Sequence, residues 1–205
     1  MRKAFFIFIF GAAFLYPCFS QNMLLLGGEY NLYTSQYSSA AGPQFWSAGI
    51  GFNMKILNEY FQNDLMLNLG RIRAKAFEMV EIQEEDSEDV HNELVEAGEK
   101  DKLLFTVKDS FYFTLDGSFV GIRAGVFAAL GLYDIIDFPT VYDLFVNAGG
   151  FAGLCFFPKS LFSLALDFSP GFAAAFRLGG GGPYINDMGL SMSFSAGIRI
   201  NFDKI

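Results

Sequence analysis

Hydrophobic and polar residues alternate with a period of two over most of this chain. The clearest case is the segment from Leu190 to Asp203, where every even position is apolar and every odd position is Ser, Gly, Arg, Asn or Asp. Successive side chains of a β-strand point to opposite faces, so this segment predicts a strand with one apolar and one polar face. Its length is sufficient to cross a lipid bilayer at a tilt.

The same alternation recurs along the chain and predicts an all-β protein. Two irregularities stand out. In the third segment Leu65, Leu67 and Leu69 share one face but Ile72 lies on the other, so we expect a bulge near Gly70. Pro170 in the seventh segment predicts a bulge or an end to regular pairing. The eight predicted strands are residues 23–33, 45–57, 64–77, 102–115, 119–133, 142–157, 160–177 and 190–203.

The connections between these strands alternate in length. Asp116-Gly117 between two alternating runs is a strong hairpin signal. Outer-membrane barrels have short periplasmic turns and longer external loops, and with a periplasmic N-terminus every second connection from the first is external. Those are the longer connections here, which predicts an up-and-down antiparallel barrel. The longer connections are 34–44, 78–101, 134–141 and 178–189, and the shorter ones are 58–63, 116–117 and 158–159.

Alternation alone does not say which face points outward. A soluble, lipocalin-like barrel would place its apolar side chains inside and its polar side chains in water. The polar face of this chain consists mainly of Gly, Ser, Ala and Asn with few Lys or Glu. A water-facing exterior normally carries many charges, so we expect the polar face to line the lumen of a transmembrane barrel.

The first 20 residues have the pattern of an export signal. Met1-Arg2-Lys3 is a short basic region, an apolar region follows from Ala4 to Tyr16, and Cys18-Phe19-Ser20 places small residues before a cut at Gln21. An uncleaved anchor and a lipoprotein site at Cys18 are alternatives, the second disfavoured by the preceding Pro17. We therefore expect a signal peptide over 1–20 and one barrel domain over 21–205.

The charge of the chain is concentrated in one connection. The net charge is −8 at pH 7, and removal of Arg2 and Lys3 with the signal peptide would make it −10. Segment 78–101 holds eleven acidic residues against Lys100, so the rest of the mature chain is neutral overall. This predicts a long acidic external loop and gives nucleic-acid binding no electrostatic support. Cys155 would be the only cysteine of the mature chain, which excludes an intramolecular disulfide.

A few charged residues fall on the polar face of their strands. An Arg that faced lipid near the bilayer midplane would cost about 2–4 kcal/mol. Inside a narrow lumen the same side chains can pair, so we expect an internal charge network that fills and stiffens the barrel. Its predicted members are Glu29, Arg123, Asp167 and Arg199.

Aromatic residues lie on the same parity as the predicted luminal residues. They would fill the interior, form the girdles at the membrane interfaces, or line an apolar channel. The predicted luminal aromatic residues are Tyr33, Phe45, Phe127, Phe145 and Phe151, and Phe119, Tyr133 and Phe157 share their parity.

Catalytic and metal-binding patterns are weak. His91, with Ser87 and Asp89, superficially resembles a hydrolytic site, but a histidine in an acidic loop is more simply a solvent-exposed residue, so we predict no enzyme and no cofactor. Clustered carboxylates suggest weak divalent-cation binding, although their spacing lacks the pattern of a dedicated site and a solvated acidic loop is the simpler interpretation. These carboxylates are Glu84, Glu85, Asp86, Glu88 and Asp89.

The predicted architecture resembles the small eight-stranded outer-membrane proteins of bacteria, the OmpA-barrel, OmpX and OmpW group. The resemblance covers 21–205 and is one of pattern. Members often end on an aromatic residue that the assembly machinery reads, whereas this chain ends Phe202-Asp203-Lys204-Ile205. The resemblance implies the bacterial outer membrane as location, and membrane lipid and the barrel assembly machinery as partners.

Two classes of function follow. In the first, the barrel has a packed lumen and a structural or surface-interaction role. In the second, which the OmpW resemblance implies, it is a narrow conduit or binding barrel for small apolar molecules. A barrel of eight strands leaves no open aqueous pore, so we favour the first class. A soluble lipocalin-like ligand-binding barrel is the remaining alternative.

Overall fold

The computed structural model describes residues 21–35, 44–58, 60–83, 90–133, 142–178 and 184–202. The predicted signal peptide and the acidic residues 84–89 lie outside the described residues. Within the described residues, no helix is long and apolar enough to cross a membrane.

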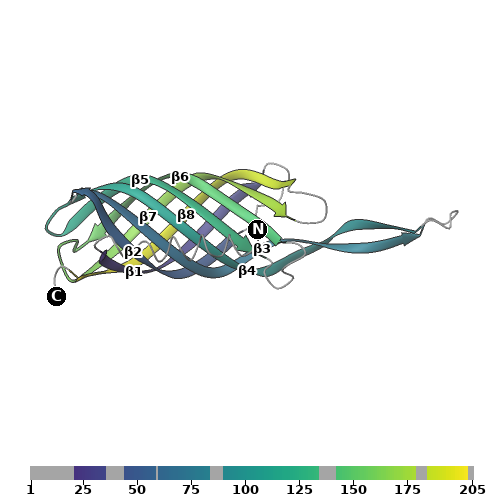
Figure 1. Cartoon of the computed structure of the whole chain (residues 1–205), viewed down its shortest axis with the longest axis horizontal. Helices are drawn as coiled ribbons and strands as arrows, with labels where there is room; N and C mark the ends of the chain where they lie inside the picture. Colours follow the sequence, from purple (N-terminus) through teal and green to yellow (C-terminus); the bar gives the residue numbers. More distant parts are fainter. Residues whose placement is uncertain are drawn as a thin grey trace.

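Eight antiparallel strands close into one barrel in the order of the chain, which confirms the predicted fold (Figure 1). Each strand pairs with its sequence neighbours, and β8 closes the barrel on β1. The strands are β1 (Gln21–Ser35), β2 (Gln44–Asn58), β3 (Phe61–Gln83), β4 (Val90–Asp116), β5 (Val120–Tyr133), β6 (Tyr142–Phe156), β7 (Phe162–Leu178) and β8 (Tyr184–Asn201).

The pairing register fixes the tilt of the strands. Following the paired residues from strand to strand around the barrel leads from Leu24 back to β1 at Thr34, ten residues further along that strand. A stagger of ten residues over eight strands corresponds to a tilt of about 40°. The row that climbs the barrel in this way is Leu24, Phe52, Leu65, Asp109, Ala128, Ala148, Phe172, Leu190 and Thr34.

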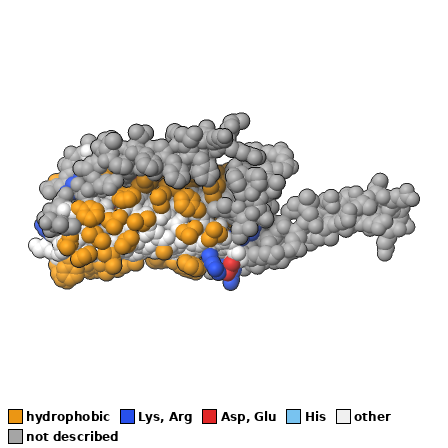
Figure 2. All heavy atoms as spheres, turned by 60° about the horizontal axis from the view of Figure 1, so that its bottom comes forward, with side chains coloured by type: hydrophobic (Ala, Val, Ile, Leu, Met, Phe, Trp, Pro, Cys, Tyr) orange, Lys and Arg blue, Asp and Glu red, His pale blue; other side chains and the backbone are white. Residues whose placement is uncertain are grey.

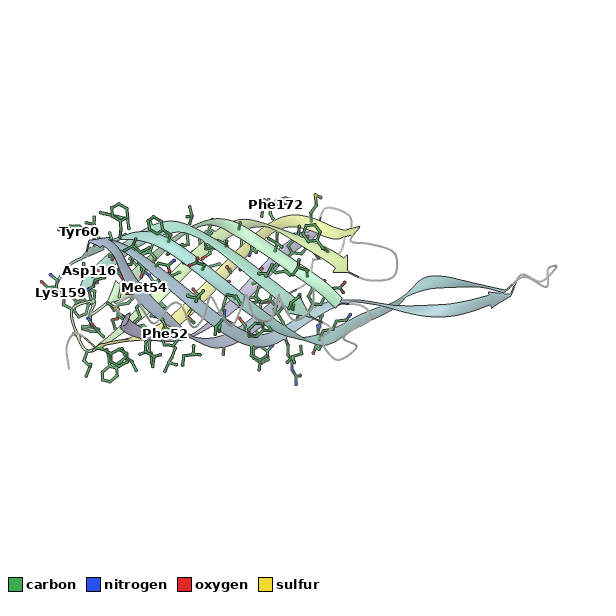
Figure 3. The ribbon with its side chains drawn as sticks, in the orientation of Figure 1. Phe52, Met54, Tyr60, Asp116, Lys159 and Phe172 are labelled. Carbon is green, nitrogen blue, oxygen red and sulfur yellow. The ribbon has the colours of Figure 1, made fainter. Side chains whose placement is uncertain are left out.

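The short connections and both ends of the barrel domain lie at one end, which we call the turn end; the opposite end is the loop end. Tyr60, Asp116 and Lys159 lie together at the turn end in Figure 3. The connection after β4 is longer than the Asp116-Gly117 turn expected from the sequence: Gly117 donates to the carbonyl of Val120, and three residues separate β4 from β5.

The connection between β6 and β7 begins at Phe157, whose φ of 56° lies in the left-handed region. Its backbone N–H donates to the carbonyl of Phe119 at 2.8 Å, and the two rings pack edge to face. This links two neighbouring turns. Phe119 and Phe157 are therefore exposed at the turn end, although they share the parity of the luminal residues.

The bulge expected near Gly70 is absent. The register of β3 with both neighbours runs without a shift from Asn63 to Arg73. Ile72 consequently points inward and is fully buried, while Arg71 and Arg73 point outward at the loop end. The apolar parity changes at Ile72 because the outer face of β3 at that point lies beyond the apolar band that contacts lipid. The strand therefore needs no apolar side chain on its outer face there.

Pro170 interrupts pairing without shifting it. On the β8 side Pro170 stands opposite Met192 in a regular register. On the β6 side the partners run from Gly149 opposite Gly171 to Ala152 opposite Phe168, in one register, with no pair assigned between them. Proline has no N–H to donate, which accounts for the local gap.

The segment predicted as the loop 78–101 is largely a β-ribbon. β3 continues to Gln83 and β4 begins at Val90, and the two strands stay paired along this length. Pairing to β2 stops at Arg73 and pairing to β5 stops at Leu104, so the two strands project alone beyond the barrel (Figure 1). Sequence alone missed this extension because its mixed charged and apolar residues do not alternate cleanly.

Candidate functional site

A buried cluster of charged side chains lies in the lumen, and Asp64 of β3 is at its centre. One Nη atom of Arg199 contacts both carboxylate oxygens of Asp64, at 2.9 and 2.7 Å. Arg123 approaches the same carboxylate at 3.5 Å. These residues come from β3, β5 and β8, and each lies on the inward parity of its strand. Asp64 therefore neutralises charge from two other strands.

Asp167 of β7 holds the other side of Arg123. The Nε of Arg123 donates to one oxygen of Asp167 at 2.8 Å, and an Nη atom contacts the second oxygen. Such a two-point pairing fixes the plane of the guanidinium group. Ser195 donates to Asp167 at 3.3 Å. A Cβ at Gly153 would overlap the Asp167 carboxylate, so glycine at the paired position gives this side chain its room.

Neutral polar groups complete the cluster toward the turn end. The Tyr112 hydroxyl lies 3.0 Å from the Asp64 carboxylate and 3.1 Å from the Oε1 of Gln62, and it accepts from Arg199. The Nδ2 of Asn53 lies 2.7 Å from Asp64 and 3.0 Å from the Tyr112 hydroxyl. Buried charges are stable only when their remaining hydrogen-bonding capacity is also met, and these side chains supply it.

Aromatic rings pack against the two arginines. Both guanidinium groups lie over the Tyr112 ring, at 5.4 Å for Arg123 and 5.6 Å for Arg199. Tyr112 and Phe151 both pair with Gly125, and their rings meet edge to face at a centroid distance of 5.6 Å. Glycine between the two strands leaves the space that these rings fill. The cluster is therefore held by cation–π contacts as well as by ion pairs.

A separate ion pair lies nearer the middle of the barrel. Lys108 of β4 contacts Glu29 of β1 across the lumen at 3.1 Å, and both side chains are about nine-tenths buried. The Lys108 ammonium also lies 4.7 Å from the centre of the Phe127 ring. The acids Glu29, Asp64 and Asp167 are thus matched in number by the bases Lys108, Arg123 and Arg199. A cavity of about 80 Å³ lies among these six side chains.

Toward the loop end the lumen holds a cluster of buried apolar and aromatic side chains, which we call the aromatic plug. Phe145 is at its centre and packs edge to face on Tyr33 and Phe45, at centroid distances of 6.2 and 5.5 Å. All members are at least 96% buried. The plug consists of Tyr33, Phe45, Ile72, Leu104, Tyr133, Phe145 and Ala173.

The outer wall of the barrel is apolar. Figure 2 shows hydrophobic side chains over the described wall on one face, with charged side chains visible near its ends. Aromatic residues gather outside at the turn end, where Phe61 packs on Phe111 and Phe113. Phe172 points away from the barrel nearer the loop end (Figure 3). A closed barrel with an apolar outer wall and a polar lumen has a surface suited to contact with lipid. This excludes the soluble lipocalin-like alternative.

The structure brings the four predicted charged residues into the lumen, but in two groups. Arg123, Asp167 and Arg199 belong to the cluster around Asp64, whereas Glu29 pairs with Lys108. Asp64, Tyr112 and Lys108 were not among the luminal residues predicted from the sequence. Their even or odd position along the strand could have predicted that they face the lumen. Asp64, for example, lies on the opposite parity to Leu65 and its apolar neighbours.

The predicted luminal aromatic residues also divide. Tyr33, Phe45 and Phe145 form the plug, and Phe151 packs in the cluster with Tyr112 and Phe127. The acidic residues 84–89 lie outside the described residues. Among the residues that are described, no group of three or more His, Cys, Asp or Glu side chains is placed to hold a metal ion.

The similarity of this chain to known proteins is found in its fold. No family model matches the chain, and no curated protein sequence matches it. Neisserial surface protein A has a similar structure, with 14% sequence identity, a TM-score of 0.51, and coverage of 89% of this chain and 98% of that chain. The fold is that of the small eight-stranded outer-membrane barrels. The exposed apolar residues of the outer wall agree with a barrel that lies in a membrane.

Two other solved outer-membrane barrels align over the same share of the chain. The attachment invasion locus protein Ail of Yersinia pestis is 12% identical, with a TM-score of 0.37 and coverage of 89% of this chain and 100% of that one. OprG of Pseudomonas aeruginosa is 10% identical, with a TM-score of 0.43 and coverage of 89% and 96%.

Proposed function

We propose that this outer-membrane barrel is a closed scaffold with a structural or surface-interaction role, without enzymatic activity. The observation that carries the proposal is the filled lumen. The aromatic plug occupies it toward the loop end, and the charged cluster around Asp64 crosses it toward the turn end. An aqueous solute would have to displace both, and an apolar solute that passed the plug would next meet paired charges.

The β3–β4 ribbon supports the interaction role. Beyond Arg73 and Leu104 the two strands pair only with each other among the described residues, so each presents an unpaired backbone edge. An unpaired edge is a template for an added strand from another chain. The segment 78–101 carries eleven acidic residues, which favours a partner with a basic surface.

The remaining partners belong to the same proposal. Membrane lipid covers the apolar wall, and the barrel assembly machinery inserts the chain. Weak divalent-cation binding at Glu84, Glu85, Asp86, Glu88 and Asp89 stays a prediction.

The proposal is tested first by conductance. Refolded protein in a planar bilayer is expected to show no stable ohmic conductance. Liposomes that contain it should take up neither a small hydrophilic dye nor a small apolar dye faster than protein-free liposomes. Uptake of the apolar dye alone would favour the alternative, a narrow conduit for apolar molecules, which the apolar composition of the plug makes the second candidate.

Orientation is tested separately. An epitope tag inserted beside Ser87 should be labelled on intact cells, because β3 and β4, which flank it in the sequence, extend beyond the loop end, and the loop end is expected to face outward. A tag inserted beside Lys159 at the turn end is the matched control and should be labelled only after permeabilisation. The reverse pattern would overturn the external position of the ribbon.

A further inference from the structure

One carboxylate breaks the apolar outer wall. In the barrel wall, from Leu103 to Leu115, β4 has seven outward side chains, and Asp109 is the fourth of them. Three apolar residues lie on each side of it along the strand, so it stands at the middle of the band. The seven are Leu103, Phe105, Val107, Asp109, Phe111, Phe113 and Leu115.

Asp109 is far from both membrane interfaces. Seven alternate positions on a strand tilted by about 40° span roughly 30 Å, which is the thickness of a bilayer core. The carboxylate is exposed rather than covered by the protein. Placing an ionisable side chain at such depth in a membrane costs free energy, and such side chains usually pair with another polar group.

Only one of the two carboxylate oxygens of Asp109 has a hydrogen-bond partner among the described residues. Asn63, on the adjacent strand β3, donates from Nδ2 to Oδ1 of Asp109, and the same Nδ2 lies 3.3 Å from the carbonyl oxygen of Ser110. The second oxygen of Asp109 has no hydrogen-bond partner among the described residues. Asn63 itself is buried, and among the exposed outward side chains described in the band Asp109 is the only charged or amide group.

We propose that this face, β3 to β5, is where a second copy of the chain docks within the membrane. Two copies inserted in the same direction can form a twofold dimer only about an axis along the membrane normal. Such an axis brings together residues at equal depth, so Asp109 of one copy meets Asp109 of the other. When one of the two carboxyl groups is protonated it donates to the other, so the two facing groups are complementary.

The second copy supplies what Oδ2 of Asp109 lacks. It brings a carboxyl group that shares one proton with Asp109. Interhelical polar contacts of this kind stabilise helix association in membranes, and the physical reason applies equally to strands, since lipid offers no alternative partner.

The neighbouring side chains fit the same arrangement. Opposite β5 of one copy the twofold axis places β3 of the other. By register Leu67 of β3 lies at about the depth of Ala128 of β5, so a bulky side chain meets a small one. Ala148 continues the row of small side chains beyond Ala128. Small residues allow the two walls to approach closely.

The experiment measures the mass of the folded, full-length mature protein in mild detergent by light scattering. The wild-type chain is expected to be a dimer. Asp109→Leu should give a monomer, whereas Asp109→Asn should stay dimeric because the amide keeps both donor and acceptor. Heat-modifiable migration on a gel verifies that each variant is folded. A wild-type monomer, or a dimeric Asp109→Leu variant, would overturn the proposal.

A matched pair of variants locates the face. Ala128→Phe places a bulky ring beside Asp109, its paired residue on β4, and should raise the dimer dissociation constant at least tenfold. Ala196→Phe on β8, also an exposed lipid-facing alanine, should leave it unchanged. Crosslinking in native membranes gives a second readout. Val107→Cys should form a disulfide dimer, and Phe168→Cys on β7 should not; Cys155 is buried and serves as an internal negative control. Crosslinking through Phe168→Cys alone would assign the dimer to another face and reject this one.

Discussion

The two halves of the lumen are filled by opposite kinds of chemistry. Toward the turn end the interior is an ion cluster around Asp64, in which position and direction of each group matter. Toward the loop end it is the aromatic plug around Phe145, which needs only volume and shape. The barrel wall is the same in both. The comparison shows that a narrow lumen can be closed either by matched charges or by packed rings, with different sensitivity to substitution.

The largest effect is expected at the centre of the ion cluster. Asp64→Ala removes the carboxylate that Arg123 and Arg199 share and leaves buried positive charge unmatched. We expect the free energy of unfolding to fall by about 3–5 kcal/mol. Urea titration of the refolded barrel in liposomes, followed by tryptophan fluorescence, measures it. A loss below ~1 kcal/mol would mean that water reaches the cluster and that the lumen is open there.

The plug should respond to lost volume. Phe145→Ala removes the ring that packs on Tyr33 and Phe45 and leaves a cavity, so unfolding should become easier by about 3–4 kcal/mol. Phe145→Leu is the control and should recover at least half of this loss, because volume alone matters. Failure of leucine to restore stability would imply that the plug depends on directed ring contacts.

Within the ion cluster, charge should matter more than size. Arg199→Leu leaves Arg123, at 3.5 Å, as the remaining positively charged partner of Asp64 among the described residues, and we expect a loss of about 2–3 kcal/mol. Ser193→Leu on the same strand faces the lumen without stranding a charge. The urea midpoint of the Ser193→Leu variant should fall less than that of the Arg199→Leu variant. If the two midpoints fell equally, overpacking rather than charge would explain both.

The Tyr112 hydroxyl tests how far directed bonds contribute. Tyr112→Phe keeps the ring under both guanidinium groups and removes only the hydroxyl that bridges Asp64, Gln62 and Asn53. The expected loss is about 1–2 kcal/mol. A double-mutant cycle with Asn53→Ala should show coupling, and strict additivity would argue that the hydroxyl acts alone.

The smallest effect is expected outside the lumen. Arg73 and Asp101 form an ion pair of 3.4 Å at the loop end, where both side chains are at least half exposed. Asp101→Asn should change the free energy of unfolding by less than ~0.5 kcal/mol. Comparison with Asp64→Asn, measured under the same conditions, isolates burial as the variable, since both substitutions remove one carboxylate charge.

The fold was largely predictable because its signal is local. A period of two assigns each side chain to a face without knowledge of any other strand, and this was sufficient for eight strands, an antiparallel barrel and an apolar outer wall. The parity of Arg123 and Arg199 also placed them in the lumen before any contact was known. The same rule misplaced Phe119 and Phe157, because parity does not say where the barrel ends.

The amino-acid sequence by itself thus determined which face of each strand meets lipid. Only the tertiary structure decided which residues meet across the lumen. Asp64 and Arg199 are 135 positions apart, and Lys108 and Glu29 are 79 apart. Their contacts depend on the ten-residue stagger around the closed barrel, which sums the register of all eight strand pairs. That stagger is a property of closure and not of any one strand, so no local pattern carries it.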